Sequence, residues 1–190
     1  MDTLIVIVIV IVLIAAVIAA VMVTRTRRKS EDLKDSFGPE YERTVAASGD
    51  DRKTAEHELA DRQKRHDAYE IRPLDANARD RYAGAWQQAQ ARFVDQPSEA
   101  VSEAHELVDR VLRERGYPVD DFAEQADAVS VDHPEVVHDY RAAHAVSLAN
   151  ERQEATTEDL REAMVHYRSL FDRLLDGPST QPPETQEARK

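Results

Sequence analysis

The sequence predicts an all-α protein: one N-terminal transmembrane helix, a polar stalk-like helical region, a small helical bundle and a disordered C-terminal tail. Two observations support this: twenty consecutive apolar residues near the start, and the helical spacing of the other apolar residues. The predicted boundaries are 4–23 for the membrane helix, 24–73 for the basic cluster and stalk, 74–176 for the acidic bundle and 177–190 for the tail.

Residues 4–23 are long enough to cross a bilayer, because twenty helical residues span about 30 Å. Each backbone amide in lipid needs an internal partner, so a single span must be helical. A cleaved signal peptide is the alternative. It would have a basic start and a shorter apolar stretch, whereas Met1-Asp2-Thr3 contains no basic side chain. The sequence therefore favours a permanent anchor in the cell membrane.

Four basic side chains directly follow the apolar segment: Arg25, Arg27, Arg28 and Lys29. The positive-inside rule then places the N-terminus outside and the C-terminal domain in the cytoplasm. These side chains would lie at the membrane surface, against anionic lipid head groups. Two alternatives stay open: the cluster acts only as a stop-transfer signal, or the domain faces the envelope side.

The remainder of the chain is acidic and poor in large apolar residues. Removing Asp2 and the four basic residues from the net charge of −12 leaves −15 for residues 30–190. From Thr24 onward, Leu, Ile, Val and Phe make up 27 of 167 residues, which approaches the composition of disordered chains. So acidic a domain repels nucleic acid, and we expect no such partner. The absence of Cys excludes disulfides and thiolate chemistry, and the single, scattered glycines exclude phosphate-binding loops.

The stalk region contains two helical patterns. Gly38-Pro39 predicts the start of a short helix that runs to about Ser48, with Pro at its tolerated first position. Asp50 or Asp51 can cap a longer helix over 51–70. Most side chains of that helix are charged and few are apolar, so it would be largely solvated, or would form a weak coiled-coil seam.

Between residues 74 and 176 the apolar residues repeat at helical spacing on about four helices, which predicts a bundle rather than disorder. Asp75 and then Thr156 or Thr157 are predicted caps, and Gly116 is a predicted left-handed stop. The apolar faces comprise Ala78, Tyr82, Trp86, Ala89 and Phe93; Val101, Ala104, Val108, Val111 and Leu112; Phe122, Ala126 and Val129; Val137, Tyr140, Ala143, Ser147 and Leu148; Leu160, Met164, Tyr167, Phe171 and Leu174.

Two junctions between these helices have sequences that suggest caps. Asp120 is predicted to cap the short helix that begins near Phe122. Asp132-His133-Pro134 is predicted to be a cap followed by Pro near the start of the next helix.

Catalytic and metal motifs are weak. Glu135 and His138 have the E-x-x-H spacing of di-iron bundles, but those need the motif twice, so we interpret the two as surface side chains. His144 is predicted to be a partly buried, hydrogen-bonded histidine, and the alternative is a pH-sensitive contact. We expect no cofactor and favour a protein that is not an enzyme. The alternative is a metal- or histidine-dependent activity centred on His133, His138 and His144.

Several segments resemble a family of uncharacterised bacterial membrane proteins, common in high-G+C Gram-positive bacteria, with one N-terminal transmembrane helix and a helical domain. The segments are FGPEYERTV (37–45), IRPL (71–74), RYAGAWQQAQARFVDQP (81–97), RGYPVDDF (115–122), VDHPEVVHDYRAAH (131–144) and ATTEDLREAMVHYRSLFDRLL (155–175). The resemblance implies this architecture, and it implies no activity or catalytic residue.

The leading hypothesis is a docking or scaffolding module that presents its acidic bundle at the cytoplasmic membrane face. A protein partner with basic segments would fit its charge. Tyr117, Asp121, His133 and Arg141, at the helix junctions, are the candidate partner surface. Self-association through the helix over 51–70 would make a homo-oligomer.

Overall fold

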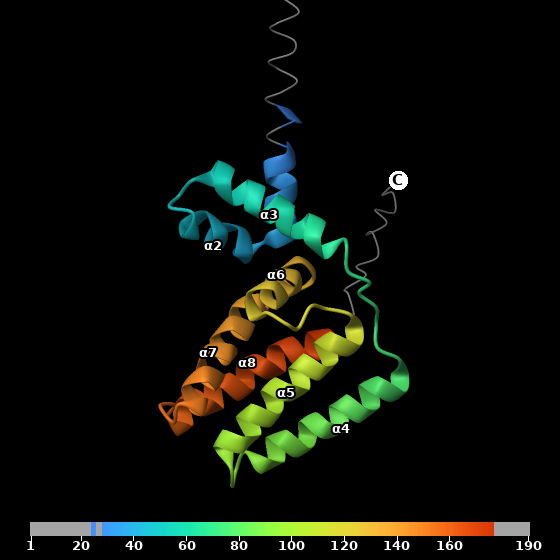
Figure 1. Ribbon diagram of the computed structural model, residues 1–190, viewed down its shortest axis with the longest axis vertical. Coiled ribbons are helices and arrows are strands. Elements are labelled where there is room, and N and C mark those ends of the chain that lie inside the picture. Colours follow the sequence, from blue (N-terminus) through green and yellow to red (C-terminus); the bar gives the residue numbers. More distant parts are fainter. Residues whose placement is uncertain (1–23, 26–27, 177–190) are drawn as a thin grey trace, which may run out of the picture. The chain divides into compact units, whose positions relative to one another are not determined.

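The computed structural model describes residues 24–25 and 28–176 (Figure 1). Every regular element in these residues is an α-helix, which confirms the all-α prediction. None of the helices they form is both long and apolar enough to cross a membrane. The predicted span (4–23), Arg27 and the predicted tail (177–190) lie outside the described residues.

The described residues divide into two compact units, one up to residue 60 and one from residue 61 onward. The boundary falls inside α3 (Arg52–His66). Residues 61–73, which the sequence analysis assigns to the stalk, therefore belong with the second unit.

In the first unit, residues 28–37 are helical and α2 (Pro39–Ala47) follows directly. Gly38 separates the two helices with a φ of 45°, in the region that favours glycine. Its N–H donates to the carbonyl of Lys34 at 2.8 Å, and Pro39 takes the first position of α2, as predicted.

Asp51 begins α3, as the sequence predicted. Its Oδ1 accepts from the backbone N–H groups of Lys53 at 3.0 Å and Thr54 at 3.3 Å. Most charged side chains of α3 are exposed, whereas its apolar residues Ala55 and Leu59 are fully buried.

The helix departs from the prediction at its C-terminal end, because α3 ends at His66 instead of continuing to residue 70. The N–H groups of Ala68 and Tyr69 donate to carbonyls three residues back, which tightens the chain into turns. The Tyr69 hydroxyl then donates to Glu124 at 2.5 Å. The segment after α3 thus leaves the helical path, and Tyr69 in it contacts α6 instead of continuing the helix.

The second unit contains the predicted bundle. Its helices are α4 (Ala76–Arg92), α5 (Pro97–Arg115), α6 (Phe122–Asp132), α7 (Val137–Glu151) and α8 (Thr157–Asp176). α8 packs against both α5 and α7, α4 packs on α5, and α6 packs on α7 (Figure 1). The short α6 is a helix of its own, so residues 74–176 form five helices, where the sequence suggested about four.

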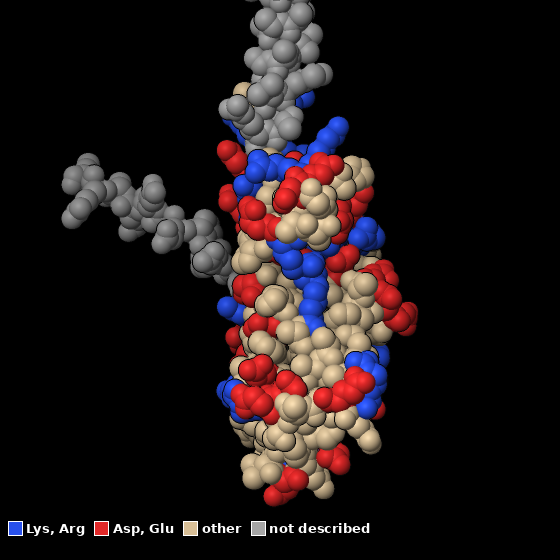
Figure 2. All heavy atoms as spheres, turned by 90° about the vertical axis from the view of Figure 1, so that its left-hand side faces the viewer, with Lys and Arg blue, Asp and Glu red and all other residues tan. Residues whose placement is uncertain are grey.

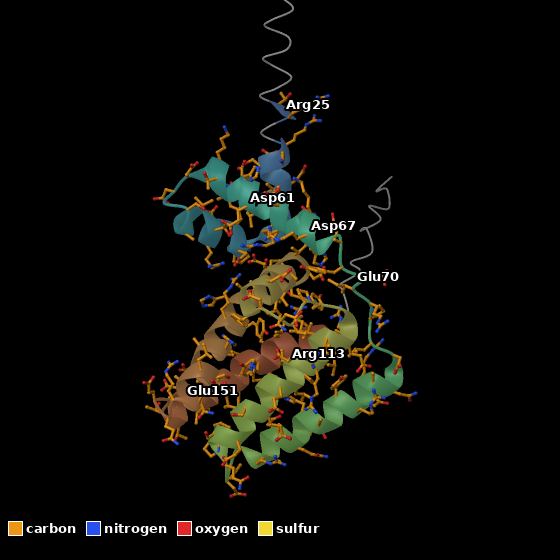
Figure 3. All side chains as sticks on the ribbon, in the orientation of Figure 1. Arg25, Asp61, Asp67, Glu70, Arg113 and Glu151 are labelled. Carbon is orange, nitrogen blue, oxygen red and sulfur yellow. The ribbon has the colours of Figure 1, made fainter. Side chains whose placement is uncertain are left out.

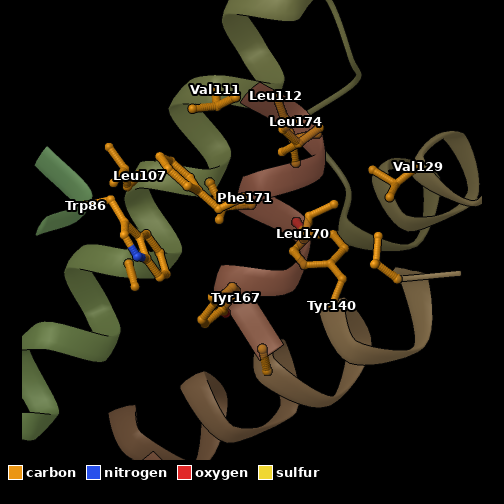
Figure 4. Close-up of a cluster of buried hydrophobic side chains, with 14 of the residues drawn as sticks. Trp86, Leu107, Val111, Leu112, Val129, Tyr140, Tyr167, Leu170, Phe171 and Leu174 are labelled. Atoms are coloured by element: carbon orange, nitrogen blue, oxygen red, sulfur yellow. The ribbon is translucent and has the colours of Figure 1, made fainter. Parts of the chain in front are cut away.

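The core follows the predicted apolar faces closely. Leu170, Phe171 and Leu174 of α8 are at most 1% exposed, and Trp86 of α4 stacks on Phe171 with ring centroids 4.7 Å apart (Figure 4). Leu148 is an error of the sequence analysis, because it is 40% exposed. The neighbouring Ser147 takes the buried position on α7 and hydrogen-bonds to Tyr167 at 2.8 Å.

Some of the predicted helix ends are confirmed. Asp75 accepts from the N–H of Ala78 at 2.7 Å at the start of α4, and Gly116 ends α5 with a φ of 94°. The Thr156 hydroxyl accepts from the N–H of Asp159 at 3.2 Å at the start of α8.

The prediction for Asp120 is wrong, because its neighbour Asp121 caps α6 and accepts from the N–H of Glu124 at 2.9 Å. The prediction for Asp132 is wrong as well. Asp132 is the last residue of α6, Pro134 lies in a turn, and α7 starts only at Val137.

Candidate functional site

Several cavities in the described residues are lined by charged side chains, and two of them, one in each unit, contain residues that the sequence analysis singled out. The first is formed by the basic residues that the sequence places at the membrane surface. Arg25, Arg28 and Lys29 are exposed, and Figure 3 labels Arg25 at the start of the described chain. Arg25 and Lys29 line a cavity of about 720 Å³. We call it the basic hollow; its other lining residues are Asp51, Lys53, Thr54, Glu56 and His57.

The two carboxylates in the lining of the basic hollow, Asp51 and Glu56, both accept hydrogen bonds from neighbouring groups. Asp51 caps α3, and hydrogen bonds, first of all from the side chain of Thr54, lower its pKa. Glu56 accepts from the hydroxyls of Ser30 and Tyr41. By contrast, the side chains of Arg25, Lys29 and Lys53 form no salt bridge within the described ranges. The sequence analysis missed Lys53, since only folding brings it to the basic cluster.

The second place is a partly buried hydrogen-bonded group, the Asp132 centre (His66, Tyr117 and Asp132). Oδ2 of Asp132 accepts from the Tyr117 hydroxyl at 2.5 Å and from Nε2 of His66 at 2.9 Å. Three chain segments meet there: the end of α3, the turn after α5 and the end of α6. The stretches RGYPVDDF and VDHPEVVHDYRAAH, singled out in the sequence for their resemblance, thus meet at Asp132.

The hydrogen bonds and the burial in the Asp132 centre shift the pKa of each member. The hydrogen bond to Asp132 raises the pKa of His66 above 6.5, although burial opposes this. Burial raises the pKa of Asp132, but the bonds from His66 and Tyr117 outweigh it and hold the value below 3.8. Burial, aided by the charge of Asp132, raises the pKa of the Tyr117 hydroxyl. The favoured state is an ionised Asp132 with protonated partners.

The Asp132 centre borders a cavity of about 300 Å³, with Arg115 in its lining. Asp67, Tyr69 and Ile71 complete the wall, and Asp67 is labelled in Figure 3. Arg115 is fully buried and donates from Nη1 to the carbonyl of Leu174 at 3.0 Å, near the C-terminal end of α8. Its Nη2 is buried and has no hydrogen-bond partner in the described part of the chain.

The four residues predicted as a partner surface do not form one surface. Tyr117 and His133 are buried. Asp121 is exposed and caps α6, while Arg141 is half-buried with its Nη2 4.0 Å from Asp127. The helix junctions therefore place Tyr117 and Asp132 together in the Asp132 centre, and the four predicted residues form no common exposed patch.

The three histidines of the alternative hypothesis lie in different surroundings. His133 is buried, and burial together with the nearby Arg115 lowers its pKa. His138 is exposed. His144 is partly buried, as predicted, but it stacks on Phe122 at a centroid distance of 3.5 Å instead of hydrogen-bonding.

Glu135, the proposed metal-binding partner of His138, lies 3.3 Å from Nε of Arg173. Across residues 24–25 and 28–176, no three His, Asp or Glu side chains are placed to hold a metal ion.

The sequence analysis did not foresee a polar network inside the bundle. The Tyr167 hydroxyl lies 3.1 Å from Nδ1 of His105, and the Tyr140 hydroxyl donates to Gln125 at 2.5 Å. Gln125 in turn donates to Asp109 at 3.4 Å. These bonds link α5, α6, α7 and α8 and satisfy polar groups that would otherwise be costly to bury.

The surface of the second unit is acidic overall. Residues 61–176 contain 25 Asp and Glu against 15 Lys and Arg. Figure 2 shows one face of the molecule, where acidic and basic side chains are interspersed. Basic side chains therefore interrupt the acidic ones on that face.

Comparisons with protein-family models, curated proteins and solved structures found no match for this chain. The resemblance to the uncharacterised bacterial family stays a prediction.

Proposed function

We propose that the chain is a single-pass membrane protein whose acidic helical bundle docks a basic segment of a partner protein at the cytoplasmic face. The observation that carries this proposal is the acidic excess of residues 61–176, next to a chain start with a predicted span and a basic cluster. Complementary charge speeds association and selects among partners.

The side of α5 that carries Glu99 and Glu106 is the best candidate surface. The two side chains are exposed, are seven residues apart on one helix face, and have no salt bridge to any described residue. Glu103 lies between them and pairs with Arg92 at 2.9 Å. A basic segment bound along α5 could form salt bridges with Glu99 and Glu106 without displacing an existing ion-pair partner.

A second copy of the chain is the other candidate partner. We do not assign this contact to a coiled-coil seam on α3, because its apolar residues Ala55 and Leu59 are fully buried. Any self-association would have to use another face of the protein.

The membrane part of the proposal is tested by fusing reporters to the C-terminus of the full chain. We expect fluorescence from a green fluorescent protein fusion and no activity from an alkaline phosphatase fusion. The reverse pattern would place the bundle on the envelope side.

The docking part is tested by site-specific photo-crosslinking from position 106 of the full chain in bacterial cells. We expect one reproducible partner whose crosslinks point to a basic segment. Glu99→Lys should weaken that crosslink, while Glu158→Lys should leave it unchanged, because Glu158 already pairs with Arg161 on α8. No crosslink, or one insensitive to Glu99→Lys, would refute docking on α5.

Histidine-based acid–base chemistry is the second candidate function, and the Asp132 centre supports it. A carboxylate that holds one ring nitrogen of a histidine fixes its orientation and raises its basicity. Here Asp132 holds Nε2 of His66 at 2.9 Å beside a cavity of about 300 Å³. We therefore assign the alternative hypothesis of a histidine-dependent activity to His66, in place of His133, His138 and His144.

An activated ester such as p-nitrophenyl acetate tests this second candidate. Hydrolysis by the full chain should exceed that of free imidazole at equal concentration, and His66→Gln should abolish the excess. The control is His138→Gln, at an exposed histidine outside the centre. Equal rates for the two variants would remove His66 as a reactive group.

A further inference from the structure

The basic hollow brings together cations from two separate parts of the sequence. Arg25 and Lys29 follow the predicted span, and Lys53 comes from the first turn of α3. We infer that the basic hollow holds the phosphate of an anionic phospholipid head group; this inference rests on the proposed membrane placement of residues 4–23.

The charge of the basic hollow matches a phosphodiester. Three cationic side chains face two carboxylates, so without His57 the lining carries a net charge of +1. The hydrogen bonds of Asp51 and Glu56 are directed to other groups, and neither carboxylate forms a salt bridge with Arg25, Lys29 or Lys53 among the described residues. A phosphodiester head group carries one negative charge and would neutralise the site.

Side chains, rather than backbone amides, would make the contacts. The N–H groups of Lys53 and Thr54 are taken by Oδ1 of Asp51, and the Thr54 hydroxyl donates to Oδ2 of the same residue at 2.6 Å. Guanidinium and ammonium groups bind phosphate oxygens through charge-assisted hydrogen bonds. Binding should therefore weaken as salt concentration rises.

The volume and the position agree with this ligand. A cavity of about 720 Å³ falls in the size range of small-molecule sites. Arg25 is two residues beyond the apolar segment, which at about 1.5 Å per helical residue is within reach of the head groups. The phosphate would come from the membrane in which the chain is anchored.

The test uses the full chain in nanodiscs and an amine-reactive label read by mass spectrometry. Nanodiscs of phosphatidylcholine alone are compared with nanodiscs that also contain phosphatidylglycerol. Labelling of Lys29 and Lys53 should fall about fivefold in the anionic nanodiscs, the effect expected for one basic side chain at an anionic surface. Lys64 of α3 is the internal control, because its side chain is 76% exposed and it does not line the hollow.

Substitutions distinguish binding of the head group in the basic hollow from a general attraction of the chain to the anionic membrane. Lys53→Ala should reduce the protection of Lys29, Lys53→Arg should retain it, and Lys64→Ala should leave it unchanged. Protection lost at high salt would also support the inference. Equal labelling of Lys53 in the two nanodiscs would overturn it.

A third arm adds inorganic phosphate to the neutral nanodiscs. If phosphate alone protects Lys53 as well as phosphatidylglycerol does, the hollow is a site for free phosphate and the lipid assignment is overturned. Failure here is distinguishable from failure of the proposed function, because the reporter fusions and the crosslinks from α5 do not depend on Lys53.

Discussion

Replacing Asp132 by Asn tests the reasoning on the Asp132 centre most directly. The ionised carboxylate accepts from Tyr117 at 2.5 Å and from His66 at 2.9 Å through the same oxygen. Hydrogen bonds to charged groups contribute about 1.5–3 kcal/mol each. The Asn oxygen can accept both bonds but carries no charge, and neutral hydrogen bonds contribute only about 0.5–1.5 kcal/mol each, so we expect the free energy of unfolding to fall by about 2–3 kcal/mol.

The same substitution should change the pH dependence of stability. The pKa of His66 is raised in the folded protein, so its contribution is fully present below about 6.5 and is lost as pH rises through the folded value. The pKa of Asp132 is lowered, so its contribution is present above about 3.8 and is lost as pH falls through the folded value. The pair therefore stabilises most between these two pH values, and Asp132→Asn should remove this maximum.

The assay is denaturant unfolding of the full chain in mild detergent, followed by circular dichroism at several pH values. Nuclear magnetic resonance titration of His66 accompanies it. In Asp132→Asn the pKa of His66 should fall. The matched control is Asp67→Asn, because Asp67 is 72% exposed and lies 3.9 Å from the other ring nitrogen of His66. The reasoning is refuted if the two variants lose equal stability, or if the pKa of His66 does not change in Asp132→Asn.

Three further substitutions test the fold by the same unfolding assay. Gly116→Ala should cost about 2–4 kcal/mol, because φ is 94° and the new Cβ would lie 2.5 Å from the carbonyl oxygen of Glu70; a loss below about 0.5 kcal/mol would contradict this. Leu170→Ala should cost about 2–5 kcal/mol, since the side chain is fully buried, and a near-neutral effect would mean that α8 does not pack as described. Asp121→Ala should cost about 1 kcal/mol and Asp120→Ala much less, since only Asp121 caps α6; the opposite order would restore the prediction made from the sequence.

The bundle was predictable because its signals are local. Apolar residues three or four positions apart share one face of a helix, so Leu160, Met164, Tyr167, Phe171 and Leu174 indicate α8 without any knowledge of its neighbours. Gly116 could be predicted as a stop for the same reason, because the backbone conformation after a helix decides which residue fits.

The errors occur where a local signal competes with a distant contact. Asp132 precedes a Pro and has the composition of a cap, but its carboxylate binds Tyr117 and His66, which is 66 residues away in the sequence. Tyr69 belongs to a helical pattern, but α3 ends before it and its hydroxyl bonds to the distant Glu124.

The sequence by itself determined the all-α class, the start of α3 and the helical faces of the bundle, since helix periodicity and capping depend on residues within a few positions of one another. It also predicted the anchor, the orientation and an acidic docking module. Only the tertiary structure decided that His66 meets Asp132, that Arg115 is buried beside them, and that Lys53 joins Arg25 and Lys29 around one hollow. The physical reason is that side-chain pairing across a fold depends on how helices pack, and one sequence does not specify which distant residues that packing brings together.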